Sequence, residues 1–155
     1  ADNVIPDNAE LRGTVRTLSE EALDLLERRM TEITDLTAQA FNCKSNFEFA
    51  RKYPPTINHA KEAELCAEVA RAIVGPENVD QTIRPSMGAE DFAFMLKAKP
   101  GCYVWLGNGD GDHRSKGHGL GPCTLHNGSY DFNDNLLPIG ASYWVELAKR
   151  WLAKT

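Results

Sequence analysis

The chain has 155 residues, a length that suits about one domain and allows a hydrophobic core. Its 17 Lys and Arg against 22 Asp and Glu give a formal net charge of -5, without a basic run long enough to follow a nucleic-acid backbone. No apolar run approaches the roughly 18 residues that cross a bilayer. We therefore expect neither nucleic acid nor a membrane as a partner.

The cysteines and the first residues indicate where the protein works and how much of it is present. The cysteines are widely spaced, without a C-x-x-C pair, and their apolar or small neighbours are typical of buried thiols. They are Cys43, Cys66, Cys102 and Cys123. This pattern predicts a reducing, cytoplasmic location. The chain begins at Ala1 rather than Met and enters strand-like sequence almost at once, so we expect an upstream portion.

The pattern of residues 1–53 predicts strand, strand, helix, strand. Residues 3–5 are β-like, residues 11–17 alternate in polarity, and Ser19 suits a helix cap. Residues at helical spacing then predict an amphipathic helix to about Ala40. They are Leu23, Leu26, Met30, Ile33 and Thr37. Residues 43–53 alternate again until Pro54 and Pro55, where we place a domain boundary. This order predicts a ferredoxin-like α+β unit without its opening strand and helix.

Residues 54–155 predict an α/β layer, in which helices alternate with apolar strands. Asn58 is expected to cap a helix that Gly75 and Pro76 end. We expect strands at residues 79–83 and 102–106, a short helix at residues 90–97, and a final helix that Pro138 opens. The glycine-rich residues 107–128 are typical of a functional loop or of a disordered segment.

His126 lies in the polar stretch of residues 121–134, a setting in which a loop can present a metal ligand. The spacing of His113, His118, Cys123 and His126 fits no compact structural zinc motif. His126 is either one ligand of a larger site or a histidine satisfied by the loop backbone. Because a hydrolytic metal site needs three or more protein ligands, one histidine points to part of a site.

Two other groups of residues could bind an anion. Gly88 precedes Glu90 and Asp91 at an expected helix start, where free amides bind anions, although a helix cap is the alternative. Adjacent helical residues diverge by about 100°, which disfavours Glu90 and Asp91 as an acid/base pair. Arg16, on a strand beside Asn3, suits a carboxylate, with a solvated salt-bridged surface as the alternative. Serine-hydrolase, Walker and dinucleotide-binding motifs are absent from the sequence.

Three segments in order resemble the C-terminal half of the dinuclear-metal amidohydrolases. They read NVIPD and LRGTVRT within residues 3–17, PSMGAEDF at residues 85–92, and LH followed by YDFND within residues 125–134. That family includes hippurate hydrolase, N-acyl-amino-acid amidohydrolase, aminoacylase, plant auxin-conjugate hydrolases and glutamate carboxypeptidase. The chain is most similar to its bacterial hippurate hydrolase subgroup.

The resemblance implies a fold and a set of site residues. Residues 1–53 would be the second part of a ferredoxin-like lid that commonly mediates dimerisation, so a homo-oligomer is expected. Residues 54–155 would be the C-terminal part of an α/β metallo-aminopeptidase-like catalytic domain. By position, His126 matches the last metal ligand, Asn3 and Arg16 match residues that contact the carboxylate or carbonyl region of the substrate, and Gly88 lies in a loop that lines the pocket.

The resemblance also implies the chemistry of the intact enzyme. Two divalent ions, of Zn, Mn, Co or Ni, would polarise an amide carbonyl and activate a bridging water, and a glutamate base would pass the proton to the leaving amine. The substrate would be an N-acyl amino acid such as hippurate, cleaved to a carboxylic acid and an amino acid. The base and the other ligands lie upstream, so we expect this chain alone to hold no catalytic residue, to bind no stoichiometric metal and to be inactive. The alternative is a stand-alone lid-like interaction or dimerisation module without catalysis.

Overall fold

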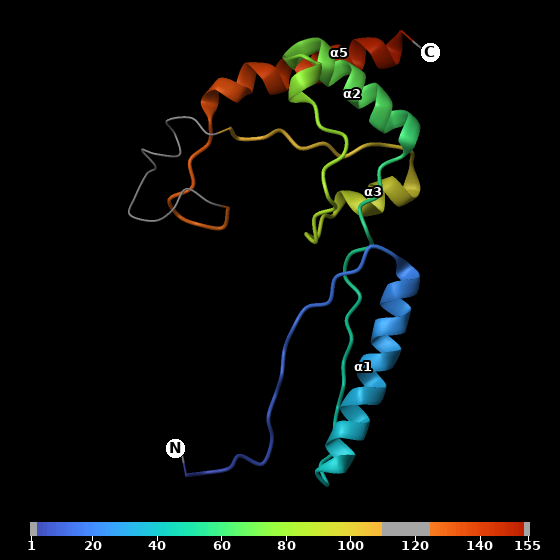
Figure 1. The fold of residues 1–155 in the computed structure, drawn as a ribbon, viewed down its shortest axis with the longest axis vertical. Helices are drawn as coiled ribbons and strands as arrows, with labels where there is room; N and C mark the ends of the chain where they lie inside the picture. Colours follow the sequence, from blue (N-terminus) through green and yellow to red (C-terminus); the bar gives the residue numbers. More distant parts are fainter. Residues whose placement is uncertain (1–2, 110–124, 154–155) are drawn as a thin grey trace. The chain divides into compact units, whose positions relative to one another are not determined.

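The computed structural model describes residues 3–109 and 125–153, and the chain divides into two compact units. Unit 1 comprises Ala1–Thr56 with Pro85–Phe94, and unit 2 comprises Ile57–Arg84 with Met95–Thr155. The α-helices of the described residues, which Figure 1 labels, are α1 (Glu20–Ala40), α2 (Ala60–Val74), α3 (Phe92–Ala98) and α5 (Leu137–Leu152). Two short 3-10 helices are η1 (Pro76–Asn78) and η2 (Asp134–Leu136).

The long helix of unit 1, α1, begins where its sequence predicts. The Ala22 N–H donates to Ser19 Oγ at 3.1 Å, and the first turn carries two glutamates that favour the helix dipole. Yet no residue of α1 is buried. Of the predicted apolar positions, Leu26 is 37% exposed and Ile33 is 54% exposed. The described residues therefore cover the apolar face of α1 only in part.

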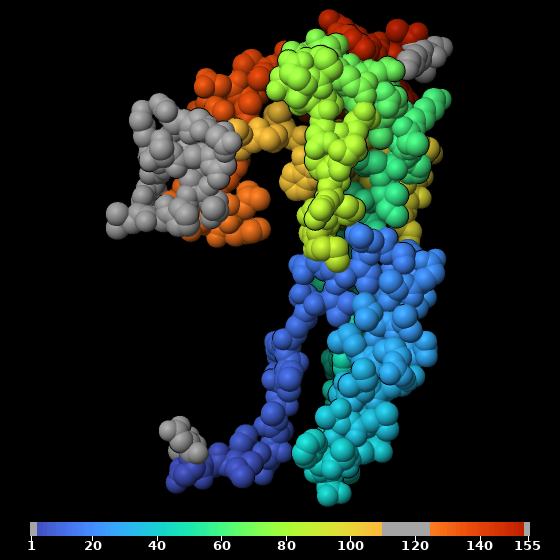
Figure 2. Space-filling model, in the orientation of Figure 1, coloured from blue at the N-terminus to red at the C-terminus, as the bar shows by residue number. Residues whose placement is uncertain are grey.

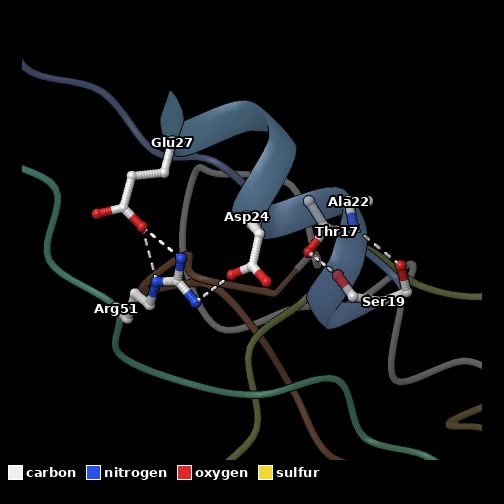
Figure 3. Close-up of polar contacts among 6 residues, drawn as sticks. All are labelled: Thr17, Ser19, Ala22, Asp24, Glu27 and Arg51. Carbon is white, nitrogen blue, oxygen red and sulfur yellow. Dashed lines mark hydrogen bonds and ion pairs between the residues drawn. The ribbon is translucent and has the colours of Figure 1, made fainter. Parts of the chain in front are cut away.

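Residues 43–53 run beside α1 and are tied to it by charge (Figure 3). Arg51 Nη1 lies 2.7 Å from Asp24 Oδ1, and Arg51 Nε donates to Glu27 Oε2 at 2.8 Å. The predicted alternation is present, because Phe47 and Phe49 are half-buried with ring centroids 6.2 Å apart, while the residues between and beside them are exposed. Exposed polar contacts hold this segment to the helix, since Ser45 Oγ also donates to Asp35 Oδ1 of α1.

The expected pairing of residues 3–5 with residues 11–17 does not appear in the described part of unit 1. These residues are extended and take part in no β-ladder. Val4, Ile5 and Leu11 are 66%, 93% and 92% exposed, and Figure 2 shows this segment running away from α1. Without a strand pair among these described residues, the α+β lid stays a prediction. A strand needs a neighbouring strand to satisfy its backbone N–H and C=O groups.

Unit 2 has a small apolar core where α2 packs against α5 (Figure 1). The buried residues of α2 are Leu65, Cys66, Ala67 and Val69. Gly75 ends α2, as predicted, with φ 87° and ψ 149°, a backbone conformation that suits glycine alone. Pro138 lies in the first turn of α5, also as predicted.

The expectation that Asn58 caps α2 is wrong. The N-cap is His59, which makes no side-chain capping bond. Asn58 instead pairs with the backbone of Tyr103: its Nδ2 donates to the Tyr103 carbonyl at 2.8 Å, and its Oδ1 accepts the Tyr103 N–H at 2.7 Å. The side-chain amide thus imitates a strand neighbour, which satisfies both backbone groups of Tyr103.

Other expectations for unit 2 are met only in part. Neither of the segments at residues 79–83 and 102–106 joins a ladder within the described residues, so the α/β class stays a prediction. Residues 80–82 form a bend, in which Asp80 Oδ1 accepts the Thr82 N–H at 2.7 Å. Cys66 is buried and Cys102 half-buried, whereas Cys43 in unit 1 is exposed, contrary to expectation. Across residues 3–109 and 125–153, none of the helices has the length and apolar character needed to cross a membrane.

Candidate functional site

His126 lies in unit 2, on a tight turn just before the last 3-10 turn and α5. Its side chain is exposed, and its φ of 61° lies in the left-handed region that non-glycine residues seldom adopt. None of the hydrogen bonds found among the described residues involves its ring. An exposed imidazole on a constrained backbone fits the chemistry of a single metal ligand.

Asn127 and the residues after it stabilise this turn. Asn127 Oδ1 accepts the Ser129 N–H at 2.8 Å, and the Asn127 carbonyl accepts the Tyr130 N–H at 3.0 Å. Ser129 is buried, with 7% of its surface exposed. The rings of Tyr130 and Phe132 meet edge to face at 4.8 Å. The neighbourhood of His126 is therefore a hydrogen-bonded turn with its own packing.

Arg16 and Asn3 are both exposed residues of unit 1. Arg16 Nη1 donates to Thr14 Oγ1 at 3.0 Å, a contact that occupies only one of its five donor hydrogens. Arg12, in contrast, is held by Glu10 through Nε at 2.8 Å and Nη2 at 3.1 Å. Of these two arginines, Arg16 keeps the more open guanidinium edge for a carboxylate.

Gly88 lies in an exposed loop of unit 1, where its N–H donates to Ser86 Oγ at 3.3 Å. Glu90 Oε1 accepts the Phe92 N–H at 3.3 Å, at the start of α3. The contact of Glu90 is that of a helix cap, so the capping alternative describes it better than anion binding does. On the other side of this segment, Phe94 packs against Tyr53 with ring centroids 6.0 Å apart.

The four predicted site residues are divided between the two units. Asn3, Arg16 and Gly88 belong to unit 1 and His126 to unit 2, and among the described residues of unit 1 no hydrogen bond or ion pair joins any two of Asn3, Arg16 and Gly88. Among those ranges no three His, Cys, Asp or Glu side chains converge on a point that could hold a metal ion. The remaining zinc candidates, His113, His118 and Cys123, lie outside the described residues.

Of the described thiols of unit 2, Cys66 is buried in the core and Cys102 is half-buried beside it. Burial first, and then the neighbouring Cys66 thiol, raise the pKa of Cys102 to about 12. Burial and the same thiol also raise the pKa of Tyr143, whose Oη is buried without a partner among the described residues. A raised pKa disfavours the thiolate, which is the form of cysteine that attacks as a nucleophile and binds metal. His59 is likewise structural, since its Nδ1 accepts the Gly101 N–H at 3.2 Å.

Sequence reasoning missed two residues that border the His126 turn, Asn108 and Asn133. Asn133 N–H donates to Asn108 Oδ1 at 2.9 Å, and Asn108 Nδ2 donates to the Asp131 carbonyl at 3.0 Å. A signal was available, because Asn108 stands between two glycines at the end of an apolar segment. Glycine neighbours leave the backbone free to bend around an amide side chain.

Comparison with known proteins links the chain to amide-cleaving enzymes. It is 34% identical over 152 residues to hippurate hydrolase of Campylobacter jejuni, and 31% identical over 156 residues to an IAA-amino acid hydrolase of Arabidopsis thaliana. It is 33% identical over 149 residues to N-acetyldiaminopimelate deacetylase of Bacillus velezensis. These alignments cover 98%, 98% and 96% of the chain but 37%, 34% and 37% of the relatives.

The chain thus spans about a third of the length of the curated relatives it matches. Residues 5–150 match the family described as peptidase family M20/M25/M40, which is nearly the whole chain. The match includes the His126 turn, the Gly88 loop and Arg16. On this evidence, the chain belongs to peptidase family M20/M25/M40.

Proposed function

We propose that this chain is the C-terminal portion of a metal-dependent amidohydrolase that cleaves N-acyl amino acids such as hippurate. The observation that carries the proposal is the family match over residues 5–150 together with the names of the relatives. A hippurate hydrolase, an IAA-amino acid hydrolase and an N-acetyldiaminopimelate deacetylase all act on an acyl group joined to an amino acid. Their shared chemistry is hydrolysis of that amide bond.

In the proposed enzyme His126 is one ligand to a pair of divalent ions, of Zn, Mn, Co or Ni. Such ions supply a polarised amide carbonyl and an activated water. Support for the role of His126 comes from its exposed ring and its constrained backbone. The resemblance to the amidohydrolases implies that the further ligands and the general base lie upstream of this chain. Among the described residues no three His, Cys, Asp or Glu side chains converge on a point that could hold a metal ion.

Arg16 and Asn3 have the proposed role of binding the carboxylate or carbonyl region of the substrate, and Gly88 of lining its pocket. An exposed guanidinium recognises a carboxylate through two parallel hydrogen bonds, which orients the scissile amide as well as binding it. We further propose that residues 1–53 are the second part of a lid and residues 54–155 the C-terminal part of the catalytic domain. The proposed location is the cytoplasm, which accords with the free thiols of Cys43, Cys66 and Cys102.

The test is to clone the gene with its upstream sequence and to assay the intact protein. We expect hippurate cleavage to benzoate and glycine in the presence of Zn or Mn, and none by the 155-residue chain alone. His126→Ala should lower metal affinity by more than the roughly 10- to 100-fold that outer-shell substitutions cost. A gene that starts at Ala1, or an intact His126→Ala protein with unchanged metal content and turnover, would refute the proposal.

A matched pair of arginine variants tests the substrate role. Arg16→Ala should raise KM for hippurate, because the guanidinium is proposed to bind the carboxylate. Arg12→Ala should leave KM unchanged, since Glu10 already occupies that guanidinium. Equal effects of the two substitutions would show that Arg16 belongs to a solvated strand surface.

A stand-alone interaction module is the second candidate. The observation that favours it is the exposure of large apolar side chains in unit 1, such as Ile5 at 93% and Leu36 at 65%. If the 155-residue chain is such a module, light scattering should find a defined homodimer at micromolar concentration. Aggregates without defined stoichiometry would instead fit a portion of an enzyme whose apolar faces lack their cover.

A further inference from the structure

The turn that carries His126 is anchored at its base by two asparagines. Asn108 follows the apolar segment of residues 102–106 in unit 2, and Asn133 precedes η2. Three hydrogen bonds close the base: Asn133 N–H to Asn108 Oδ1 at 2.9 Å, Asn133 Nδ2 to the Asn108 carbonyl at 3.3 Å, and Asn108 Nδ2 to the Asp131 carbonyl at 3.0 Å. We call these two residues the asparagine clamp.

The clamp uses the donor and the acceptor of the Asn108 amide at once. Its Oδ1 accepts and its Nδ2 donates, so a carboxylate at this position could keep the first contact but not the second. Asn133 is occupied in the same way, because its Nδ2 donates to Asn108 while its Oδ1 accepts the Asn135 N–H at 3.2 Å. Each asparagine therefore uses both its side-chain oxygen and its side-chain nitrogen, and a serine or an aspartate could make only some of these four hydrogen bonds.

The clamp is continuous with the turn that holds His126. Asp131, which accepts from Asn108, follows directly after Tyr130, whose N–H is bound by Asn127. His126 is therefore followed directly by two hydrogen-bonded anchors, first the Asn127 turn and then the clamp. A ligand side chain must be held within about 0.5 Å of its productive position by the hydrogen bonds and packing that support it, and these two anchors are the support that the described residues give His126.

We propose that Asn108 and Asn133 are positioning residues for His126: by pinning residues 131–133 to the residues that follow the apolar segment, they fix where the imidazole meets the metal. This rests on the proposed function, in which His126 is a metal ligand. Neither asparagine is proposed to touch metal or substrate. Their effect reaches the reaction through the position of the His126 ring alone.

The test uses the intact parent protein and reads metal affinity apart from activity. Apo protein is titrated with Zn²⁺ against a chromophoric chelator for the wild type, Asn108→Ala, Asn133→Ala and Asn108→Asp. We expect about a tenfold loss of affinity in the two alanine variants and a smaller loss in Asn108→Asp, which keeps one of the two Asn108 side-chain contacts. Asn135→Ala is the matched control, because only its backbone N–H takes part in the hydrogen bonds described, and its affinity should equal that of the wild type.

A second measurement guards against simple unfolding. Amide hydrogen exchange should show faster exchange at Ser129 and Tyr130 in the clamp variants, with unchanged exchange in α2. If an alanine variant fails to fold, Asn108→Asp and Asn133→Asp decide the matter, since Asp at 108 can still accept the Asn133 N–H and Asp at 133 can still accept the Asn135 N–H, while each loses its Nδ2 contact of the clamp. Wild-type Zn²⁺ affinity in folded clamp variants would overturn the inference.

The two proposals fail in different ways. If His126→Ala keeps its metal, the proposed function is wrong. If His126→Ala loses metal while the folded clamp variants and Asn135→Ala all bind Zn²⁺ like the wild type, the proposed function stands and the clamp has no positioning role.

Discussion

The two units of this chain are stabilised in opposite ways. Unit 2 buries a patch of α2 against α5, with Val69 fully inaccessible and Leu65 only 6% exposed. Unit 1 has a longer helix with no buried residue, and Arg51 ties it to residues 43–53 through exposed carboxylates. Apolar burial contributes far more to stability than exposed ion pairs do. Helix length is therefore no guide to which unit is the more stable.

The comparison also explains why unit 1 has so much apolar surface. Amphipathic periodicity in α1 is a property of a helix that packs on something. On that face Leu26 and Ile33 are 37% and 54% exposed, so the described residues supply the partner only in part. The chain spans only about a third of its relatives' length, which gives the proposed enzyme ample sequence from which to cover this face.

The largest expected effect is from a core deletion in unit 2. Leu65→Ala should lower the free energy of unfolding by about 2–5 kcal/mol, because it removes buried methyl groups and leaves a cavity. Leu25→Ala in α1 is the matched change in unit 1 and should cost less than about 1 kcal/mol, since half of that side chain is exposed. Urea unfolding followed by circular dichroism measures both. Equal losses would break the contrast between the units.

A glycine pair gives the next largest effect. Gly75→Ala should destabilise α2 by about 1–3 kcal/mol, because φ 87° with ψ 149° is open essentially to glycine alone. A Cβ there would also meet the Glu77 carboxylate at 2.5 Å, which forces that side chain to move. Gly13→Ala in unit 1 finds nothing within 4 Å and should stay within about 0.5 kcal/mol of the wild type. Thermal unfolding of both variants is the measurement, and a neutral Gly75→Ala would contradict the assignment.

A smaller effect tests the ion pairs of unit 1. Hydrogen bonds from Arg51 to Glu27 and then Asp24 raise the pKa of its guanidinium, so the arginine in this contact stays charged. Arg51→Gln should speed amide exchange in α1 at low salt, and the difference should shrink near 1 M salt, where the screening length falls to about 3 Å. Arg12→Gln is the control, because it removes an ion pair with Glu10, only two positions away in the sequence. A difference that persists at high salt would point to packing rather than charge.

The smallest effect is a pH dependence in unit 2. Hydrogen bonds from Gln81 first, and then Arg71, lower the pKa of Glu64 below its ordinary value of 4.5. A lowered folded-state pKa gives stability that is present above 4.5 and is lost as the pH falls through the folded value. Glu64→Gln should therefore flatten the acid side of the stability curve, whereas Glu68→Gln on the same helix should not. Parallel acid titrations of the two variants and the wild type would check this.

Local rules predicted the helices because their signals lie within a few residues of each other. Ser19 caps α1, Gly75 ends α2 and Pro138 starts α5 through contacts inside one or two turns. The resemblance to the amidohydrolases was equally local, since each motif is a short run of adjacent residues. The family assignment over residues 5–150 confirms it.

What the sequence determined by itself is the set of α-helices, the start of α1, the end of α2 and the family, because capping, periodicity and motifs depend on neighbours along the chain. Only the tertiary structure decided that Asn58 pairs with Tyr103, 45 residues away, and that Asn108 closes on Asn133, 25 residues away. An asparagine amide bonds equally well to its own turn or to a distant backbone, so its sequence neighbours do not reveal the choice. Burial was also decided by the tertiary structure. The apolar pattern of α1 predicts which face of the helix packs against a partner, but not whether this chain contains that partner.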